Sequence, residues 1–308
     1  MKAHVYDMII IGGGPGGYTA ALYAVRAGLD VLVLEKLSAG GQMALTHQID
    51  NYPGFPEGID GFALGELMQQ QAENFGARTE YAEVTSLDLK ADPKIIHSSE
   101  GRFLARTVVI ATGAGPRELN VPGEKQFAGR GVAYCAACDG MFFRNKVVVV
   151  VGGGNSAAAD TLLLSRVAKK VILVHRRDQL RATKIYHESL HKAENLEFHW
   201  NSAVEEILGE DRVSGIRLKN LISGDISDVP CDGVFISVGR QPASSLAVGQ
   251  LELDGSGYIV AGESTESSLP GIYAVGDVRT KPLRQVITAA ADGAMAVHAA
   301  ENYLASLV

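Results

Sequence analysis

Residues 7–36, DMIIIGGGPGGYTAALYAVRAGLDVLVLEK, decide the fold. The segment opens with an apolar run of strand length and then turns through three glycines. An Ala- and Leu-rich stretch follows, and a second apolar run closes the segment at Glu35. This order predicts a β-strand, a tight turn, an α-helix and a second β-strand, which together form a βαβ unit with a parallel sheet.

The same pattern occurs a second time at residues 146–176, KVVVVVGGGNSAAADTLLLSRVAKKVILVHR. The two copies align without a gap. This alignment pairs Gly12 with Gly152, Gly14 with Gly154, Gly17 with Ala157 and Glu35 with His175. A polar, alternating region follows each copy, at 79–106 and 196–228, and predicts short antiparallel strands. Each region closes with an apolar strand and a glycine, so the sequence predicts two related, doubly wound Rossmann-like α/β domains.

The C-terminal segment does not belong to the second repeat. Residues 271–278, GIYAVGDV, predict another strand, and residues 284–303 predict an Ala-rich helix. We expect this segment to complete the first domain, so that the second domain is an insertion. The predicted domains are then 1–116 with 246–308, and 117–245. Their Gly- and Pro-rich linkers lie at 115–123 and 239–245.

Composition limits the function classes. The chain has 308 residues, a net charge of −7 and 46% hydrophobic residues, with no overall basic field for nucleic acid or an anionic membrane. The first residues lack the pattern of a secretory signal, and no apolar run is long enough to cross a bilayer. We therefore expect a cytoplasmic protein.

Each glycine turn follows a strand and opens a helix, which is the context that a dinucleotide site requires. The first two glycines allow a tight turn and a close approach of the backbone to a pyrophosphate, and the helix N-terminus attracts the phosphates. Two purely structural turns are the alternative.

The two turns differ at the end of the strand that follows each of them. Glu35 could accept hydrogen bonds from a ribose 2′-hydroxyl, which suits FAD or NAD. At the matching place the second copy has His175, Arg176 and Arg177, with Arg181 shortly after. These residues suit the 2′-phosphate of NADPH, although a solvated basic turn would look the same. FAD with NADPH is the pair that makes chemical sense, because a hydride can pass from nicotinamide to flavin.

Cys135 and Cys138 are separated by two residues and lie just before the second glycine turn. This spacing allows a redox-active disulfide. Zinc is a rival, but the sequence offers no second pair of cysteines, so no metal site is expected. An inert buried pair is the other rival. Asp139 could move protons beside the thiols or could simply be a turn residue. The third cysteine, Cys231, receives no function.

Taken together, these motifs resemble the low-molecular-weight thioredoxin reductases along essentially the whole chain. The matching stretches are GGGPGG (12–17), GGQM (40–43), NYPGF (51–55), ATGA (111–114), YCAACDG (134–140), GGGNSA (152–157), HRRDQLRA (175–182), GIYAVGDV (271–278) and LRQVITAAADG (283–293). The resemblance implies a homodimer that passes electrons from NADPH through FAD and a dithiol to thioredoxin.

The resemblance also implies roles for single residues. Cys138 would face the flavin, Cys135 would attack the partner disulfide, and Asp139 would act as acid and base. The further residues implied to contact FAD are Gln42, Asn51, Ala111, Gly276, Asp277, Arg284, Gln285 and Val286. Asn155 and Ser156 would join the second glycine turn at NADPH.

One feature departs from the family pattern, and one geometric problem follows from the order of the motifs. Family members commonly carry an acidic pair shortly after the second glycine turn, where this chain has Ala158-Ala159-Asp160 and keeps one carboxylate, which puts the contacts to the NADPH ribose in doubt. Both the dithiol and the nicotinamide site fall in the inserted domain, so the two domains are expected to alternate between orientations.

Three other functions stay open: a flavin-dependent dithiol oxidase, a ferredoxin-driven reductase and a redox-sensing flavoprotein.

Overall fold

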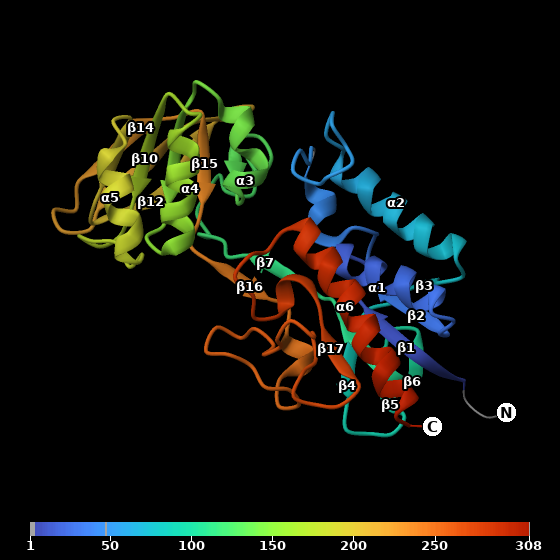
Figure 1. Ribbon diagram of the computed structural model, residues 1–308. Helices are drawn as coiled ribbons and strands as arrows, with labels where there is room; N and C mark the ends of the chain where they lie inside the picture. The colour runs from blue at the N-terminus through green and yellow to red at the C-terminus, as the bar shows by residue number, and fades with distance from the viewer. Residues whose placement is uncertain (1–3, 47, 308) are drawn as a thin grey trace. The chain divides into compact units, whose positions relative to one another are not determined.

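The computed structural model describes residues 4–46 and 48–307 and divides into two compact units (Figure 1). Unit 1 contains the chain up to Gly115 and again from Gln241 onward. Unit 2 is the continuous segment Pro116–Arg240. The predicted range was 117–245, so unit 2 begins one residue earlier than predicted and ends five residues earlier than predicted.

Unit 1 is built on a seven-stranded sheet. Strands β1 (Val5–Ile11), β2 (Val31–Glu35), β3 (Arg78–Tyr81) and β6 (Gly101–Ile110) lie parallel in the order β3-β2-β1-β6. The antiparallel strands β5 (Lys94–Ser98) and β4 (Val84–Asp88) extend the sheet beyond β6. Strand β17 (Ile272–Ala274) pairs in parallel with β6, so the C-terminal segment does return to complete this unit.

Three helices cover unit 1: α1 (Pro15–Arg26), α2 (Gly61–Asn74) and α6 (Val286–Ala305). Helix α1 packs between α2 and α6 (Figure 1). The 3-10 segments η1 (Gly41–Leu45), η3 (Ser245–Ala247) and η4 (Gly276–Val278) lie in its loops.

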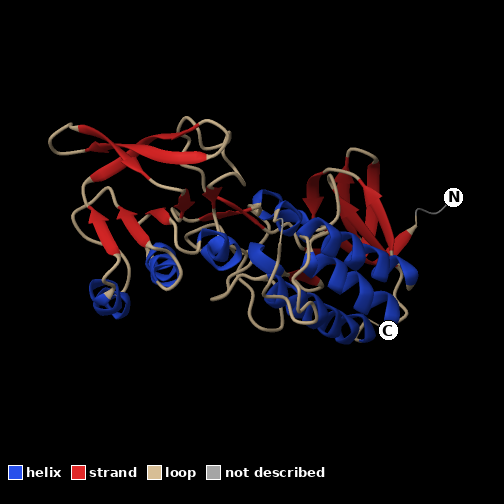
Figure 2. Cartoon of the chain, turned by 90° about the horizontal axis from the view of Figure 1, so that it is seen from above, coloured by secondary structure: helices blue, strands red, loops and turns tan. Residues whose placement is uncertain are grey.

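Unit 2 repeats this plan in a five-stranded parallel sheet. Its strands β8 (Val132–Ala133), β9 (Val147–Val151), β10 (Lys170–Val174), β11 (Leu196–His199) and β15 (Gly233–Ile236) lie in the order β11-β10-β9-β15-β8. Strand β15 therefore lies beside β9 as β6 lies beside β1. A separate antiparallel sheet contains β12 (Ser202–Gly209), β13 (Val213–Asn220) and β14 (Ile226–Pro230), and it lies across the parallel sheet from helices α4 (Asn155–Ser165) and α5 (Lys184–Lys192) (Figure 2).

The apolar runs form strands that are buried on both faces, as expected of parallel sheets. In β1, Ile9 and Ile11 enter one core cluster, and Met8 and Ile10 enter the other. In β9, Val149 and Val151 belong to one cluster, whereas Val148 and Val150 belong to a second. Two short strands, β7 (Ala114–Pro116) and β16 (Arg240–Pro242), pair where the chain passes between the units.

Part of the predicted secondary structure was wrong. Residues 79–81 and 196–199 were expected to be antiparallel, but they lie in β3 and β11, which are parallel to β2 and β10. Both are edge strands of their sheets, and their residues are exposed or only partly buried, as in many antiparallel strands. The last helix begins at Val286, so Arg284 and Gln285 precede it, and the predicted strand 271–278 ends as a 3-10 turn. Among the described residues, no helix has the length and apolar character needed to span a bilayer.

Candidate active site

The first glycine turn is closely packed on the protein side and open at the start of α1. Gly12 has φ +107°, and a Cβ there would lie 2.6 Å from the Ala111 carbonyl oxygen. A Cβ on Gly17 would lie 1.9 Å from the Gly12 oxygen, so no side chain fits. Gly14 caps α1 without any side-chain hydrogen bond, and the nearest atom to a Cβ added there would be the Gly40 carbonyl oxygen, at 4.0 Å. Free helix-start amides beside open space fit a pyrophosphate group.

Glu35 lies at the end of β2 with its carboxylate fixed by two backbone amides. The Gly13 amide donates to Oε2 at 2.6 Å, and the Leu37 amide donates to Oε1 at 3.0 Å. The carboxylate is thus held against the glycine turn and keeps further lone pairs for a ligand. A fixed acceptor at this place fits a ribose hydroxyl, which can donate, and would repel a phosphate.

The second glycine turn has the same form. A Cβ on Gly152 would lie 2.4 Å from the Ser237 oxygen. Gly154 caps α4 with no side-chain bond, and a Cβ added there would meet no atom within 4 Å. The exposed side chain of Asn155 accepts a hydrogen bond from the Thr183 amide at 2.8 Å, and Ser156 beside it is also exposed. Ala157, which is fully buried, replaces the third glycine.

The basic segment is tied to this second turn. The amides of Arg181 and Ala182 donate to the Gly153 oxygen at 2.7 and 3.1 Å, so the loop that carries Arg181 is fixed to the turn itself. The side chains of Arg176, Arg177 and Arg181 are exposed and can reach a ligand. Three exposed guanidinium groups beside open helix-start amides fit a nucleotide that carries an additional phosphate.

His175 behaves differently from its arginine neighbours. Only 5% of the residue is exposed, and its ring fills the space beside Gly153, where a Cβ would lie 2.2 Å from the imidazole. Its Nε2 atom is buried and has no hydrogen-bond partner. Burial, together with the positive charges of Arg181, Arg176 and Arg177, lowers the pKa of His175. The imidazole therefore packs against the turn, and the contact of His175 with NADPH stays a prediction.

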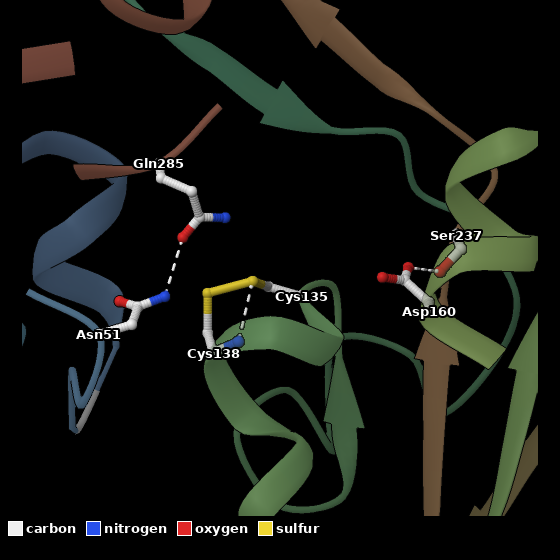
Figure 3. Close-up of a disulfide and its surroundings, with 6 residues drawn as sticks. All are labelled: Asn51, Cys135, Cys138, Asp160, Ser237 and Gln285. Atoms are coloured by element: carbon white, nitrogen blue, oxygen red, sulfur yellow. Dashed lines mark hydrogen bonds between the residues drawn. A yellow bond between two sulfur atoms is a disulfide. The ribbon is translucent and has the colours of Figure 1, made fainter. Parts of the chain in front are cut away.

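The cysteine pair forms a disulfide in unit 2, with the two Cα atoms 5.3 Å apart (Figure 3). Cys135 caps the short helix α3 (Ala136–Asp139), and the Cys138 amide donates to the Cys135 Sγ at 3.2 Å. A donor aimed at this sulfur would stabilise its thiolate after reduction. Asp139 is the last residue of α3 and is half-buried. Cys231 is a buried free thiol, and burial raises its pKa to about 12, so it is unreactive.

Two carboxyl groups of unit 2 are shielded from solvent, of which Glu124 was not considered in the sequence and Asp160 was considered only as part of the altered acidic pair. Glu124, 1% exposed, accepts from the Asn120 amide at 2.7 Å and from the Tyr134 hydroxyl at 2.9 Å, next to Cys135 in the chain. Asp160 accepts from the Ser237 hydroxyl (Figure 3), and burial raises the pKa of Asp160. Glu124 follows a Pro-Gly turn that is typical of a linker, so its sequence context gave no signal of burial.

Apart from the first glycine turn and Glu35, the residues expected at a flavin come from four separate segments of unit 1. The Asn51 Nδ2 donates to the Gln285 Oε1 at 3.0 Å, across 234 residues of sequence (Figure 3). Arg284 donates to the carbonyl oxygen of Asp277 at 3.4 Å, and Val286 starts α6. Gly276 has φ +72°.

The segment η1 carries Gln42, whose side chain is exposed. It begins against the first glycine turn, because a Cβ on Gly41 would lie 3.6 Å from the Gly14 Cα. The described residues contain no group of three or more His, Cys, Asp or Glu side chains that could hold a metal ion.

Comparison with known proteins gives one consistent result. Residues 6–293 match the family model described as pyridine nucleotide-disulphide oxidoreductase. A curated thioredoxin reductase from Treponema pallidum is 45% identical over 98% of both chains. Two solved structures, the thioredoxin reductases of Streptococcus pyogenes and Giardia duodenalis, align with TM-scores of 0.90 at 44% and 37% identity, covering 98% of this chain and 99% of theirs. These matches confirm the resemblance seen in the motifs and the doubly wound two-domain fold class.

Proposed function

The chain belongs to the pyridine nucleotide-disulphide oxidoreductase family, in which it is an enzyme of the thioredoxin reductase type, and we propose that it uses NADPH and FAD to reduce thioredoxin through Cys135 and Cys138. The observation that carries this proposal is the disulfide, which shares one chain with two open glycine turns of opposite character. One turn has a fixed carboxylate beside it, and the other has three exposed arginines.

We assign FAD to the first turn. Gly12, Gly14 and Gly17 would receive its pyrophosphate, with Ala111 behind the turn, and Glu35 would bind the adenosine ribose. The residues that would surround the rest of the molecule are Gln42, Asn51, Gly276, Asp277, Arg284, Gln285 and Val286. When bound, FAD supplies two-electron chemistry that connects a hydride donor to a disulfide.

We assign NADPH to the second turn. The open amides that follow Gly152 and Gly154, with Asn155 and Ser156 at the helix start, would bind its pyrophosphate. Arg176, Arg177 and Arg181 would bind the 2′-phosphate through charge-assisted hydrogen bonds. The small Ala157 and the buried His175 would keep the turn in shape.

The thiol steps follow from the arrangement around α3. After reduction of the disulfide, the Cys135 thiolate attacks one sulfur of the thioredoxin disulfide, which forms a mixed disulfide and releases one thiolate of thioredoxin. The Cys138 thiolate then attacks Cys135, restores the internal disulfide and releases the second thiolate. Two protons are needed for the two product thiols, and Asp139 is placed in sequence to transfer them.

We also propose that the two units change orientation during turnover. The disulfide and the second glycine turn both belong to unit 2, whereas the first glycine turn belongs to unit 1. The chain crosses between the units only at residues 115–116 and 240–241, within β7 and β16, which are natural hinges. An engineered crosslink between the units should stop turnover but leave one half-reaction intact, and full turnover of the locked enzyme would refute the rotation.

The proposed reaction can be tested by anaerobic titration of the purified holoenzyme with NADPH and then with NADH. We expect NADPH to bleach the flavin at a far lower concentration than NADH. The Cys138→Ser variant should still accept electrons from NADPH but should lose thioredoxin reduction. Cys231→Ser, which changes a buried free thiol, is the matched control and should keep full activity.

Two outcomes would overturn the proposal. A purified chain that does not hold FAD lacks the central carrier. A chain that forms peroxide from a small dithiol and does not reduce thioredoxin with NADPH is a dithiol oxidase.

Homodimer formation and a cytoplasmic location stay predictions.

A further inference from the structure

A buried charge cluster connects the first turns of α6 to the Gly276–Val278 turn. The Asp292 carboxylate, on a residue 6% exposed, accepts hydrogen bonds from Gly276, Arg279 and Lys281. At Oδ2 the donors are the Gly276 amide at 2.8 Å, the Arg279 Nε at 2.8 Å and the Lys281 Nζ at 2.7 Å. At Oδ1 the Arg279 Nη2 donates at 2.6 Å. A single carboxylate thus binds three points of one short loop.

All three charged side chains are withdrawn from solvent. Their exposed fractions are 10% for Arg279, 4% for Lys281 and 8% for Asp292. Burial raises the pKa of Asp292, but the hydrogen bonds and the positive charges of Arg279 and Lys281 together outweigh it, so the net pKa is lowered and the carboxylate is charged. Burying such a cluster is expensive, and apolar residues often stabilise a protein at least as well. Stability alone is therefore a weak reason for its presence.

The cluster fixes the loop between Asp277 and Arg284. Arg279 and Lys281 lie within this loop, and the Arg279 carbonyl oxygen accepts from the Arg284 Nη2 at 3.2 Å. The Lys281 Nζ also donates to the Thr288 carbonyl oxygen at 3.1 Å, in the first turn of α6. The loop is therefore held in position by Arg284 and by the first turn of α6.

The same part of α6 also lies against the first glycine turn. A Cβ on Gly293, the residue after Asp292, would lie 2.3 Å from the Gly16 carbonyl oxygen. A Cβ on Gly16 would lie 3.1 Å from the Ala289 oxygen. Asp292 thus holds the Gly276–Val278 turn to the part of α6 whose neighbouring residues, Ala289 and Gly293, lie against the first glycine turn.

We propose that Asp292 is a positioning residue for FAD: with Arg279 and Lys281 it holds the Gly276–Asp277 turn and the start of α6 at a fixed distance from the first glycine turn. This inference rests on the proposed FAD site. It assigns Asp292 no contact with the flavin, because its carboxylate is buried and already accepts four hydrogen bonds from Gly276, Arg279 and Lys281.

The test compares apoproteins prepared by removing the flavin. We expect Asp292→Asn to raise the FAD dissociation constant by at least about tenfold, because the amide cannot satisfy two buried cations. Lys281→Met keeps the Arg279–Asp292 pair and should raise it by about threefold, the size of one modest hydrogen bond. The visible circular dichroism of the flavin that still binds should change in both variants, since its binding groups are displaced.

The control is Asp30→Asn. Asp30 also lies between two basic side chains, His4 and Arg78, but on the surface of unit 1. This variant should bind FAD as the wild type does. Thermal unfolding of each apoprotein shows how much of an effect is loss of fold; if Asp292→Asn does not fold, Lys281→Met decides.

A lower unfolding temperature with an unchanged FAD dissociation constant and an unchanged spectrum would show a merely structural role and overturn the inference. Wild-type apoprotein that takes up no FAD would defeat the proposed function itself. Wild-type apoprotein that binds FAD, beside variants that bind it equally well, would defeat this inference alone.

Discussion

The two glycine turns cap their helices with glycines of the same extended conformation, Gly14 and Gly154, but their surroundings are opposite. Beside the first turn, the Glu35 carboxylate accepts from the Gly13 amide. Beside the second, the His175 ring packs against Gly153, and exposed arginines follow it. If the proposed assignment holds, the fold supplies helix-start amides for a pyrophosphate twice, and the few residues at the end of the next strand supply the charge that would distinguish one nucleotide from the other.

The turns also differ in how closely they are packed. Gly17 has no room for a Cβ beside the Gly12 oxygen, whereas Ala157 carries one beside Gly152. The first turn is therefore the less tolerant of the two. Four changes test these differences, and we give them from the largest expected effect to the smallest.

The largest effect should follow the loss of two of the three exposed arginines beside the second turn. In the Arg176→Ala/Arg177→Ala double variant, kcat/KM for NADPH should fall by roughly a hundredfold or more, because each lost charge-assisted hydrogen bond is worth about 1.5–3 kcal/mol. The same constant for NADH should change little, since NADH lacks the 2′-phosphate. Steady-state kinetics with both nucleotides measures this, and an equal loss with NADH would contradict the assignment.

The second effect concerns packing at the third position of each turn. Gly17→Ala should displace the first turn, destabilise unit 1 by about 1–3 kcal/mol and leave most of the purified protein without flavin. Ala157→Gly is the matched change in the second turn and should cost about 1 kcal/mol or less. The ratio of visible to ultraviolet absorbance reports flavin content, and full occupancy in Gly17→Ala would refute the difference between the turns.

A smaller effect is expected at Glu35. In Glu35→Gln the side chain keeps one acceptor but loses its charge, so FAD should bind at least about tenfold more weakly, because one charge-assisted hydrogen bond is worth about 1.5–3 kcal/mol. Titration of the apoprotein with FAD measures this. Glu83→Gln, which removes an exposed partner of Lys36, serves as the control and should leave the affinity unchanged.

The smallest effect should appear in the pH dependence of stability. The pKa of His175 is lowered below its usual 6.5 in the folded state, so the unfolded chain takes up this proton first as the pH falls. The wild type should therefore lose stability below about pH 6.5, and the loss should be complete below the folded pKa. Between pH 7 and pH 5, the unfolding midpoint of His175→Asn should fall by about 1–3 °C less than that of the wild type. Identical profiles would show that His175 is not the titrating group.

Much of the candidate site could be proposed without the structure, because its signals are local. The apolar runs, the glycine spacing, Glu35, the arginines and the cysteine pair all lie within short segments whose chemistry follows from residue type and order. The same holds for the inserted second domain, since repeat order and a leftover C-terminal strand are visible in the chain.

Tertiary structure decided what depends on distant partners or on burial. The strand at 196–199 is parallel because it lies beside β10, which its own residues do not reveal. Asn51 meets Gln285, and Asp292 meets Gly276, only after folding. Asp292 and His175 are also buried by distant parts of the chain, which their own sequence context does not reveal. The sequence by itself thus determined which chemistry the chain carries, and folding decided which polar groups are exposed to a ligand and which are enclosed by other parts of the chain.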